Sequence, residues 1–493
     1  MLPARCTIAL APIVALAIAL PTGSGRADPV DWARERLPML EPCSPPGVKE
    51  QFLCGLLQVP ENPRLPDGRR IHLSVVVAPA LMRRPRTDAW VELPGGPGNA
   101  ATDYAASYSN EFRAYRRDRD VLLVDQRGMG GSGGLYCEEL ALHRVSPLFD
   151  RFPAKAVADC RKRLLGEGVD LSQYSTAHAA DDLDAVRAWL GYPRLNLFSY
   201  SYGTRLALEY IRRYPARTRS AILWGVVAPD FRRPLYYARD GQQALDRLFD
   251  ACRANIDCAQ RFPDLPGDLA AAMRRLAEAS PTVSLRHPES GKTSRVSITP
   301  AGFAEGMWIA LFRPDTARRI PRVLRYAAHG DFEPFLDLTT ARRAPQRRYY
   351  NAAHLSVACP EEVQFVTPGA IADTYVGTFM PEARALQYLE ACKLWGLPAK
   401  PASLAPVISD VPTLLLSGDY DPVTPGRWAD GVARTLRRSR SLHASDLSHE
   451  SNGVKHAECL DYLFQDFLAR PDPRRLDASC LARMRAPQFD LRP

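Results

Sequence analysis

LNLFSYSYGT, residues 195–204, joins two segments of different periodicity and decides the architecture around it. Residues 195–198 form a short apolar run that is typical of a buried strand. Residues 204–214 carry apolar side chains at helical spacing and predict a helix. The stretch therefore predicts a strand, a tight turn and a helix in immediate succession, which is the local pattern of an α/β sheet.

The turn within this stretch carries a serine in a setting typical of a nucleophile. Ser199-Tyr200-Ser201-Tyr202-Gly203 is a variant of G-x-S-x-G, a motif whose serine occupies a strained turn between a strand and a helix. Gly203 lets the helix approach the strand closely, and Ser199 replaces the usual first glycine with another small residue. The preceding strand and the following helix are the context that this motif requires. We therefore predict that Ser201 is a catalytic nucleophile.

Strand and helix patterns alternate on both sides of this turn. Residues 71–78 and 89–93 have strand patterns, and residues 120–125 are a continuous apolar run that suits a strand buried on both faces. Residues 179–190 have helical spacing, with Thr176 as the expected N-cap. Further strands are expected at 221–225, 413–417 and 439–443, with a closing helix at 462–468. The alternation predicts a mostly parallel sheet flanked by helices.

A nucleophilic serine needs a base and an acid that orients the base, and in such a sheet they follow in the order serine, acid, histidine. The loop after residues 413–417 contains Asp421, the predicted acid, with Asp419 as the alternative. His449 follows the next expected strand and is the predicted base, with His456 as the alternative.

Backbone amides are expected to stabilise the oxyanion that forms during such a reaction. One donor should be the amide of Tyr202, directly after the nucleophile. The second should come from the loop Pro94-Gly95-Gly96-Pro97-Gly98, where the glycines allow close backbone approach. Within this loop Gly96 is the predicted donor.

The chain divides into a leader, a core in two parts and an insertion. Residues 1–27 have a charged start, an apolar run too short for a comfortable membrane span and small residues at a cleavage site. They predict a cleaved secretory signal, with an uncleaved anchor as the alternative, and hence a periplasmic or secreted protein without stable membrane insertion after cleavage. Core segments are expected at 28–231 and 402–493, separated by a mainly helical cap at 232–401.

The cysteines and the charge are consistent with export. Ten cysteines follow the signal, an even number that predicts disulfides in an oxidising compartment, and none has zinc-site spacing, so no metal is expected. The net charge of +9 is scattered among acids and does not predict nucleic-acid binding. The simplest scheme pairs neighbours: Cys43–Cys54, Cys137–Cys160, Cys252–Cys258, Cys359–Cys392 and Cys459–Cys480.

Together these motifs resemble the α/β-hydrolase family of proline iminopeptidases and tripeptidyl aminopeptidases. The resemblance rests on LPGGPG at 93–98, DQRGMGGS at 125–132, TAHAADDLDAVRAWLG at 176–191, SYGT at 201–204 and DPVTP at 421–425. It implies an α/β-hydrolase fold and an exopeptidase that needs an anion to hold the substrate ammonium. The segment SVACPEE at 356–362 is similar to a cap segment of that family, so Glu361 and Glu362 are candidate amine ligands. Two departures are Ser199 at the elbow and the absence of Gly-His-Gly around His449.

The sequence therefore predicts an exported serine aminopeptidase that acts on peptides through an acyl-enzyme and needs no cofactor. A carboxylesterase with the same triad is the alternative, because fold and triad do not determine the leaving group. A non-catalytic binding protein on the same scaffold is a further alternative. The number of residues released and the oligomeric state are left open.

Overall fold

The computed structural model describes residues 28–140, 146–286, 293–340 and 348–492. The predicted signal at 1–27 lies outside these residues. Within them, no helix is both long and apolar enough to span a bilayer.

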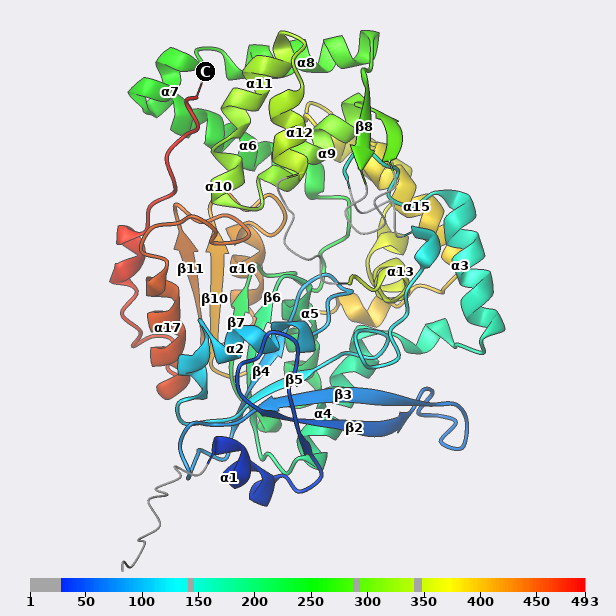
Figure 1. The fold of residues 1–493 in the computed structure, drawn as a ribbon, viewed down its shortest axis with the longest axis vertical. Coiled ribbons are helices and arrows are strands. Elements are labelled where there is room, and N and C mark those ends of the chain that lie inside the picture. The colour runs from blue at the N-terminus through cyan, green and yellow to red at the C-terminus, as the bar shows by residue number, and fades with distance from the viewer. Residues whose placement is uncertain (1–27, 141–145, 287–292, 341–347, 493) are drawn as a thin grey trace, which may run out of the picture.

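The core is built on a sheet of nine strands among the described residues, in the order β1-β2-β3-β5-β4-β6-β7-β10-β11 (Figure 1). Strands β4, β5, β6, β7, β10 and β11 run parallel to one another, whereas β1, β2 and β3 pair antiparallel at one edge. The bounds are β1 Glu41–Cys43, β2 Phe52–Pro60, β3 Arg70–Ala78, β4 Ala89–Leu93, β5 Val121–Val124, β6 Leu195–Tyr200, β7 Thr218–Trp224, β10 Thr413–Gly418 and β11 Ser439–Ala444. This is the mostly parallel sheet that the sequence predicts.

Helices cover both faces of the sheet, and successive side chains of its strands point into two separate cores. Val91 of β4 packs in the core that contains residues of α4, α5 and α16. Its neighbour Trp90 packs in the opposite core with residues of α2 and α17. Burial on both faces explains why the central strands are almost wholly apolar. The helices are α1 Pro29–Arg36, α2 Ala105–Ser109, α4 Thr176–Trp189, α5 Tyr202–Arg213, α16 Gly426–Ala433 and α17 Glu458–Ala469.

Residues 232–401, called the cap below, lie over the end of the sheet toward which the parallel strands point (Figure 1). Besides the expected helices, the cap contains two antiparallel strands, β8 Thr282–Arg286 and β9 Thr293–Ser297. Strand β9 gives no strong strand signal, because it carries polar residues and every second side chain is exposed. The helices are α6 Tyr237–Ala254, α7 Ile256–Arg261, α8 Leu265–Glu278, α9 Pro300–Ala310, α10 Pro314–Ala317, α11 Ile320–Ala328, α12 Glu333–Thr340, α13 Asn351–Glu361, α14 Pro368–Tyr375 and α15 Ala383–Trp395.

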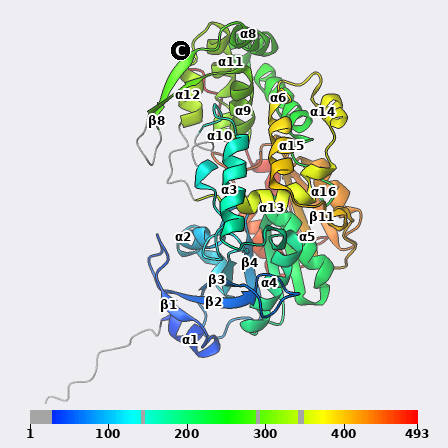
Figure 2. The same ribbon diagram turned by 90° about the vertical axis from the view of Figure 1, so that its right-hand side faces the viewer.

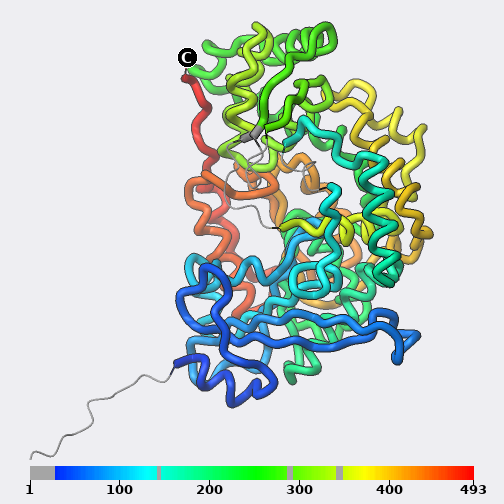
Figure 3. Tube along the Cα trace, turned by 45° about the vertical axis from the view of Figure 1, so that its right-hand side comes forward, coloured from blue at the N-terminus to red at the C-terminus, as the bar shows by residue number. Residues whose placement is uncertain are grey.

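One helix that belongs to the core segment in sequence packs against the cap in space. Helix α3 (Ala154–Gly166) precedes β6 in sequence but lies beside α15, as Figure 2 shows. Arg161 of α3 donates a hydrogen bond to the carbonyl of Trp395 at 2.9 Å. The tube in Figure 3 shows the same grouping of this early segment with the yellow helices of the cap. The structural boundary of the cap is therefore not the boundary in sequence.

Two local predictions are wrong. The N-cap of α4 is Ser175, not Thr176, because the Ser175 hydroxyl accepts the amide of His178 while Thr176 is already helical. The first strand predicted from the sequence is 71–78, whereas β1 and β2 precede it; prolines and turn residues flank β2.

The disulfide prediction is confirmed. All five neighbour pairs have sulfurs at bonding distance, and their Cα atoms are 5.1–5.8 Å apart. Cys359–Cys392 ties α13 to α15 within the cap. Cys137–Cys160 ties α3 to the loop that follows β5.

Candidate active site

The predicted catalytic residues meet because each follows a parallel strand. Ser201 follows β6, Asp421 follows β10 and His449 follows β11. The glycine loop at 94–98 follows β4, whose last residue Leu93 pairs with Ser199 of β6. Carboxyl ends of parallel strands share one edge of a sheet, so residues far apart in sequence converge there.

The turn at Ser201 is strained in the way that a nucleophile elbow requires. Its backbone has φ 54° and ψ −126°, a conformation that residues with a Cβ rarely adopt. The amide of Ser201 donates to the carbonyl of Trp224 at 2.9 Å, which holds the turn against β7. Helix α5 begins at the next residue, Tyr202. The surrounding structure therefore imposes a geometry that presents Ser201 at the sheet edge.

Gly203 makes this close approach possible, and its substitution gives a stability prediction. A Cβ at Gly203 would lie 1.9 Å from the carbonyl oxygen of Leu93, a backbone atom that cannot rotate away. We expect Gly203→Ala to lower the free energy of unfolding by about 3 kcal/mol or more, measured by chemical denaturation. Gly166→Ala is the control, since no atom lies within 4 Å of a Cβ there. Equal stability of the two variants would contradict this account of the elbow.

Asp421 and His449 form a buried pair. Oδ2 of Asp421 lies 2.8 Å from Nδ1 of His449. The amides of Val423 and Thr424 donate to Oδ1 of Asp421, each at 2.8 Å. Burial would raise the pKa of Asp421, but His449 and these hydrogen bonds outweigh it and leave the pKa below its ordinary value. The carboxylate is therefore ionised at neutral pH and suited to hold the imidazole.

Thr424 contacts both residues of this pair, and the sequence alone did not identify it. Its hydroxyl donates to Oδ2 of Asp421 at 2.8 Å and lies 3.1 Å from Nδ1 of His449. The Thr424 hydroxyl thus holds Oδ2, whereas the two amides hold Oδ1. The only signal was its place three residues after the acid in DPVTP, within reach of a turn.

The His449 ring lies next to the serine turn. The ring of Tyr200, the residue before the nucleophile, is centred 4.9 Å from the His449 ring, and its hydroxyl donates to the His449 carbonyl at 2.9 Å. A Cβ at Gly225, one residue after the carbonyl that holds Ser201, would lie 3.2 Å from Cε1 of His449. These contacts bring Ser201, Asp421 and His449 to one place.

The alternative acid and base lie apart from this place. Asp419 is partly exposed and forms a loose ion pair with Arg247 at 3.9 Å. His456 is exposed and has Glu458 as its neighbour at 3.3 Å. Neither arrangement resembles a buried acid–imidazole pair.

Two amides are available for an oxyanion. Gly95 lies against Ser201, since a Cβ at Gly95 would be 2.9 Å from the Cβ of Ser201. Gly96 follows with φ 119°, a conformation that favours glycine. The amides of Gly96 and Tyr202 donate no hydrogen bond to any residue that the structure describes. Both can therefore donate to a substrate oxygen beside Ser201.

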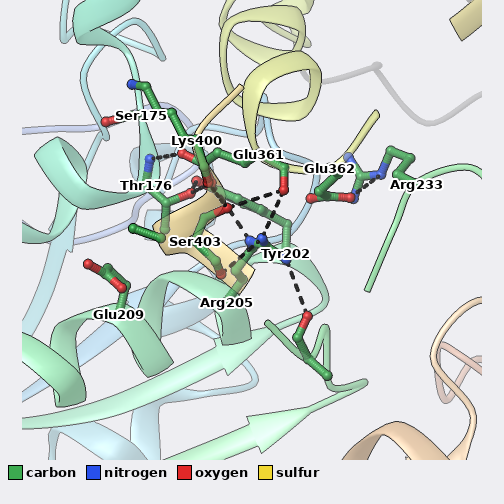
Figure 4. A network of polar contacts seen from close by, with 12 residues as sticks. Ser175, Thr176, Tyr202, Arg205, Glu209, Arg233, Glu361, Glu362, Lys400 and Ser403 are labelled. Atoms are coloured by element: carbon green, nitrogen blue, oxygen red, sulfur yellow. Dashed lines mark hydrogen bonds and ion pairs between the residues drawn. The ribbon is translucent and has the colours of Figure 1, made fainter. Parts of the chain in front are cut away.

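The two candidate amine ligands have different surroundings (Figure 4). Glu361 is buried and already engaged: Oε1 accepts the amide of Thr176 at 2.8 Å and Oε2 accepts its hydroxyl at 2.6 Å. Arg205 lies 3.7 Å from Oε2 of Glu361. The Thr176 hydroxyl in turn lies 3.0 Å from that of Tyr202. Glu361 thus connects the cap to α4 and to the residue after the nucleophile.

Glu362 is fully buried but has no such engagement. Neither of its carboxylate oxygens makes a hydrogen bond with a described residue, and its one near charge is Arg233, with Nε at 3.5 Å from Oε2. Figure 4 shows the Glu362–Arg233 pair beside, and separate from, the network around Glu361. Glu362 therefore has hydrogen-bonding capacity left for a ligand.

Among the described residues, one group of side chains is close enough to suggest a metal site: Cys137, Glu139 and Cys160. Its two sulfurs are bonded to each other in a disulfide and are not thiolate ligands.

Comparisons with known proteins found a family model, curated relatives and solved structures that this chain resembles. The family model described as "alpha/beta hydrolase fold" matches residues 91–454. Serine protease Hip1 of Mycobacterium tuberculosis is 29% identical over 457 residues, covering 83% of each chain. Tripeptidyl aminopeptidase of Streptomyces lividans is 30% identical over 203 residues, covering 38% of this chain and 37% of the relative. Among solved structures, proline iminopeptidase of Mycobacterium smegmatis has 17% identity and a TM-score of 0.39, covering 85% of this chain and 99% of its own.

Proposed function

The chain belongs to the α/β-hydrolase family, and from that premise we propose that it is an exported serine aminopeptidase that cleaves peptides from a free N-terminus. The observation that carries the proposal is Glu362, a buried carboxylate near the nucleophile elbow with both oxygens free of hydrogen bonds to described residues. Burial and Glu361 are the main causes that raise the pKa of Tyr202, and Glu362 is a smaller one, so Glu362 lies within electrostatic reach of the hydroxyl of the residue after Ser201. An ammonium group is the ligand that such a site favours.

The proposed reaction uses the residues at the sheet edge. His449 removes the proton of Ser201 as the serine oxygen attacks the carbonyl carbon, and Asp421 stabilises the imidazolium that forms. The amides of Gly96 and Tyr202 stabilise the oxyanion. His449 then protonates the leaving amine, and the acyl-enzyme is hydrolysed by a water that His449 activates.

Relatives and compartment support the choice of substrate and location. The names serine protease and tripeptidyl aminopeptidase favour an amide leaving group over the ester that a carboxylesterase would take. Five disulfides favour an oxidising compartment, in agreement with the signal predicted at 1–27. In this proposal Glu362 holds the substrate ammonium, whereas Glu361 positions Thr176 and Tyr202.

We expect Glu362→Gln to lower kcat/KM on free-amine tripeptide p-nitroanilides by about 100-fold, because the variant loses a buried charge-assisted hydrogen bond. N-acetylated anilides should be poor substrates of the wild-type enzyme for the same reason. The measurement is initial-rate hydrolysis of matched free-amine and N-acetyl anilides, with p-nitrophenyl esters alongside.

Glu209→Gln is the matched control. Glu209 lies near this network (Figure 4), but its partly buried carboxylate pairs with Arg212 and Arg213 of α5, so its loss should change kcat/KM by less than about threefold. Labelling of Ser201 by a fluorophosphonate shows whether each variant is folded. Hydrolysis of esters alone, or equal rates on free and acetylated anilides, would overturn the aminopeptidase proposal.

A further inference from the structure

Three arginines gather in the interior of the cap. Arg384 is the second residue of α15, Arg233 follows β7 and Arg151 precedes α3. Two carboxylates lie among them. Glu305 of α9 pairs with Arg384 and lies 3.8 Å from Arg151, while Glu362 pairs with Arg233.

The charges of this cluster do not balance. Three guanidinium groups face two carboxylates, so one positive charge lacks a carboxylate partner among the residues that the structure describes. Burial alone would raise the pKa of the Tyr388 hydroxyl, but Arg151, Arg384 and Arg233 outweigh burial and leave it below its ordinary value. The charges of all three arginines therefore act on the Tyr388 hydroxyl within the cap.

Part of the hydrogen-bonding capacity of the cluster is also unused. Nε of Arg384 and both Nε and Nη1 of Arg233 are buried and donate to no described residue. The side chains of Arg384 and Arg233 are 9% and 3% exposed, so bulk water does not readily satisfy these donors. Buried guanidinium donors without acceptors are costly unless a ligand completes them.

A row of aromatic rings connects the cluster to the catalytic pair. The guanidinium of Arg384 lies over the Trp308 ring at 4.4 Å. Trp308 donates from its indole nitrogen to the carbonyl of Pro422, the residue after Asp421. The Phe312 ring lies between, centred 4.7 Å from Trp308 and 5.1 Å from His449.

The cluster also reaches the oxyanion loop from the other side. A Cβ at Gly98 would lie 3.0 Å from the ring of Tyr349. Tyr349 and Glu362 are both among the groups that raise the pKa of Arg233, although burial opposes them. Ring contacts therefore link Arg384 to His449, and Arg233 lies within electrostatic reach of Tyr349, whose ring borders the glycine loop.

We propose that Arg384 and Arg233 form a subsite for an acidic side chain, so that the preferred substrates are peptides with aspartate or glutamate among their first three residues. This inference rests on the proposed aminopeptidase function. A substrate carboxylate pairs with the guanidinium that lacks a carboxylate partner and offsets the positive charge that the substrate ammonium adds. Its two oxygens match the forked donors of a guanidinium. Glu362 remains the ligand of the substrate ammonium, so one cluster binds both charges of an acidic N-terminal segment.

The test compares glutamate with glutamine, which differ in charge but hardly in shape. Tripeptide p-nitroanilides with a free amine carry one or the other at each of the three positions, with alanine elsewhere. We expect kcat/KM to favour glutamate by at least about tenfold at one position, the range of a charge-assisted hydrogen bond. In Arg384→Met this ratio should fall to about one. Arg239→Met is the control, since Arg239 also stacks on a cap ring, Tyr236, but is exposed and outside the cluster.

A second readout does not depend on peptide hydrolysis. Free tripeptides with glutamate should protect Ser201 from a fluorophosphonate at least about tenfold better than those with glutamine. Equal protection together with equal hydrolysis at every position would overturn the acidic subsite. Preferential protection without hydrolysis of any free-amine anilide would retain the subsite and overturn the aminopeptidase. Because both comparisons use the wild-type enzyme, they decide the question even if Arg384→Met fails to fold.

Discussion

Replacing Ser201 with alanine is expected to lower kcat on any substrate of the enzyme by about 10⁶-fold while leaving the free energy of unfolding nearly unchanged. The variant lacks the oxygen that attacks the carbonyl carbon, so only binding and the oxyanion amides remain to accelerate the reaction. The strain of the elbow would remain, since alanine is no better suited than serine to φ 54°. Initial rates on the free-amine anilides, with a fluorophosphonate to label the wild-type serine, measure the loss.

Ser199→Ala is the matched control for Ser201→Ala. Ser199 lies two residues earlier on β6, fully buried, with its hydroxyl donating to the carbonyl of Ile222 at 3.0 Å. It cannot reach a substrate, so its loss should cost no more than about 1 kcal/mol of stability and change kcat by less than about threefold. Residual activity of Ser201→Ala above about 1% of the wild-type rate would show that another group is the nucleophile.

Replacing Asp421 with asparagine is expected to lower kcat by about 10⁴-fold. The carboxylate accepts the Nδ1 proton of His449 at 2.8 Å and leaves Nε2 free to accept the proton of Ser201. An asparagine would direct either an oxygen or an NH₂ group toward Nδ1, and Thr424 and two amides already occupy the carboxylate's other lone pairs. The neutral side chain also cannot stabilise the imidazolium in this buried setting.

Asp419→Asn tests the alternative acid that the sequence allows. Asp419 lies two residues before Asp421, is partly exposed and pairs only loosely with Arg247. Its substitution should change kcat by less than about threefold. A loss in Asp419→Asn that matches the loss in Asp421→Asn would contradict the assignment of the acid. Both variants are compared with the wild-type enzyme at neutral pH, where the lowered pKa of Asp421 keeps the wild-type carboxylate ionised.

Local patterns were sufficient for the sheet and for the chain order of the catalytic residues. A buried parallel strand is apolar along its whole length, so residues 120–125 and 413–417 were recognisable without knowing their neighbours. The hairpin β8–β9 and strand β2 were missed because their side chains are partly exposed and carry a weaker pattern.

The sequence could not distinguish between the two candidate amine ligands, Glu361 and Glu362. Glu361 and Glu362 are adjacent and chemically identical, and nothing local distinguishes them. They differ because Thr176, 185 positions earlier, bonds one carboxylate, while Arg233 lies against the other. Only tertiary packing brings those partners to the two side chains.

The sequence by itself thus determined the alternation of strands and helices, the strained turn at Ser201 and the order of Ser201, Asp421 and His449, because each depends on residues close together in the chain. Only the tertiary structure decided that Thr424 hydrogen-bonds to Asp421, and that Glu362 rather than Glu361 lacks hydrogen bonds to described residues. It also brought Arg151 and Arg384 together at Glu305. The physical reason is that hydrogen bonding and charge balance depend on distances in space, which packing sets between segments far apart in sequence.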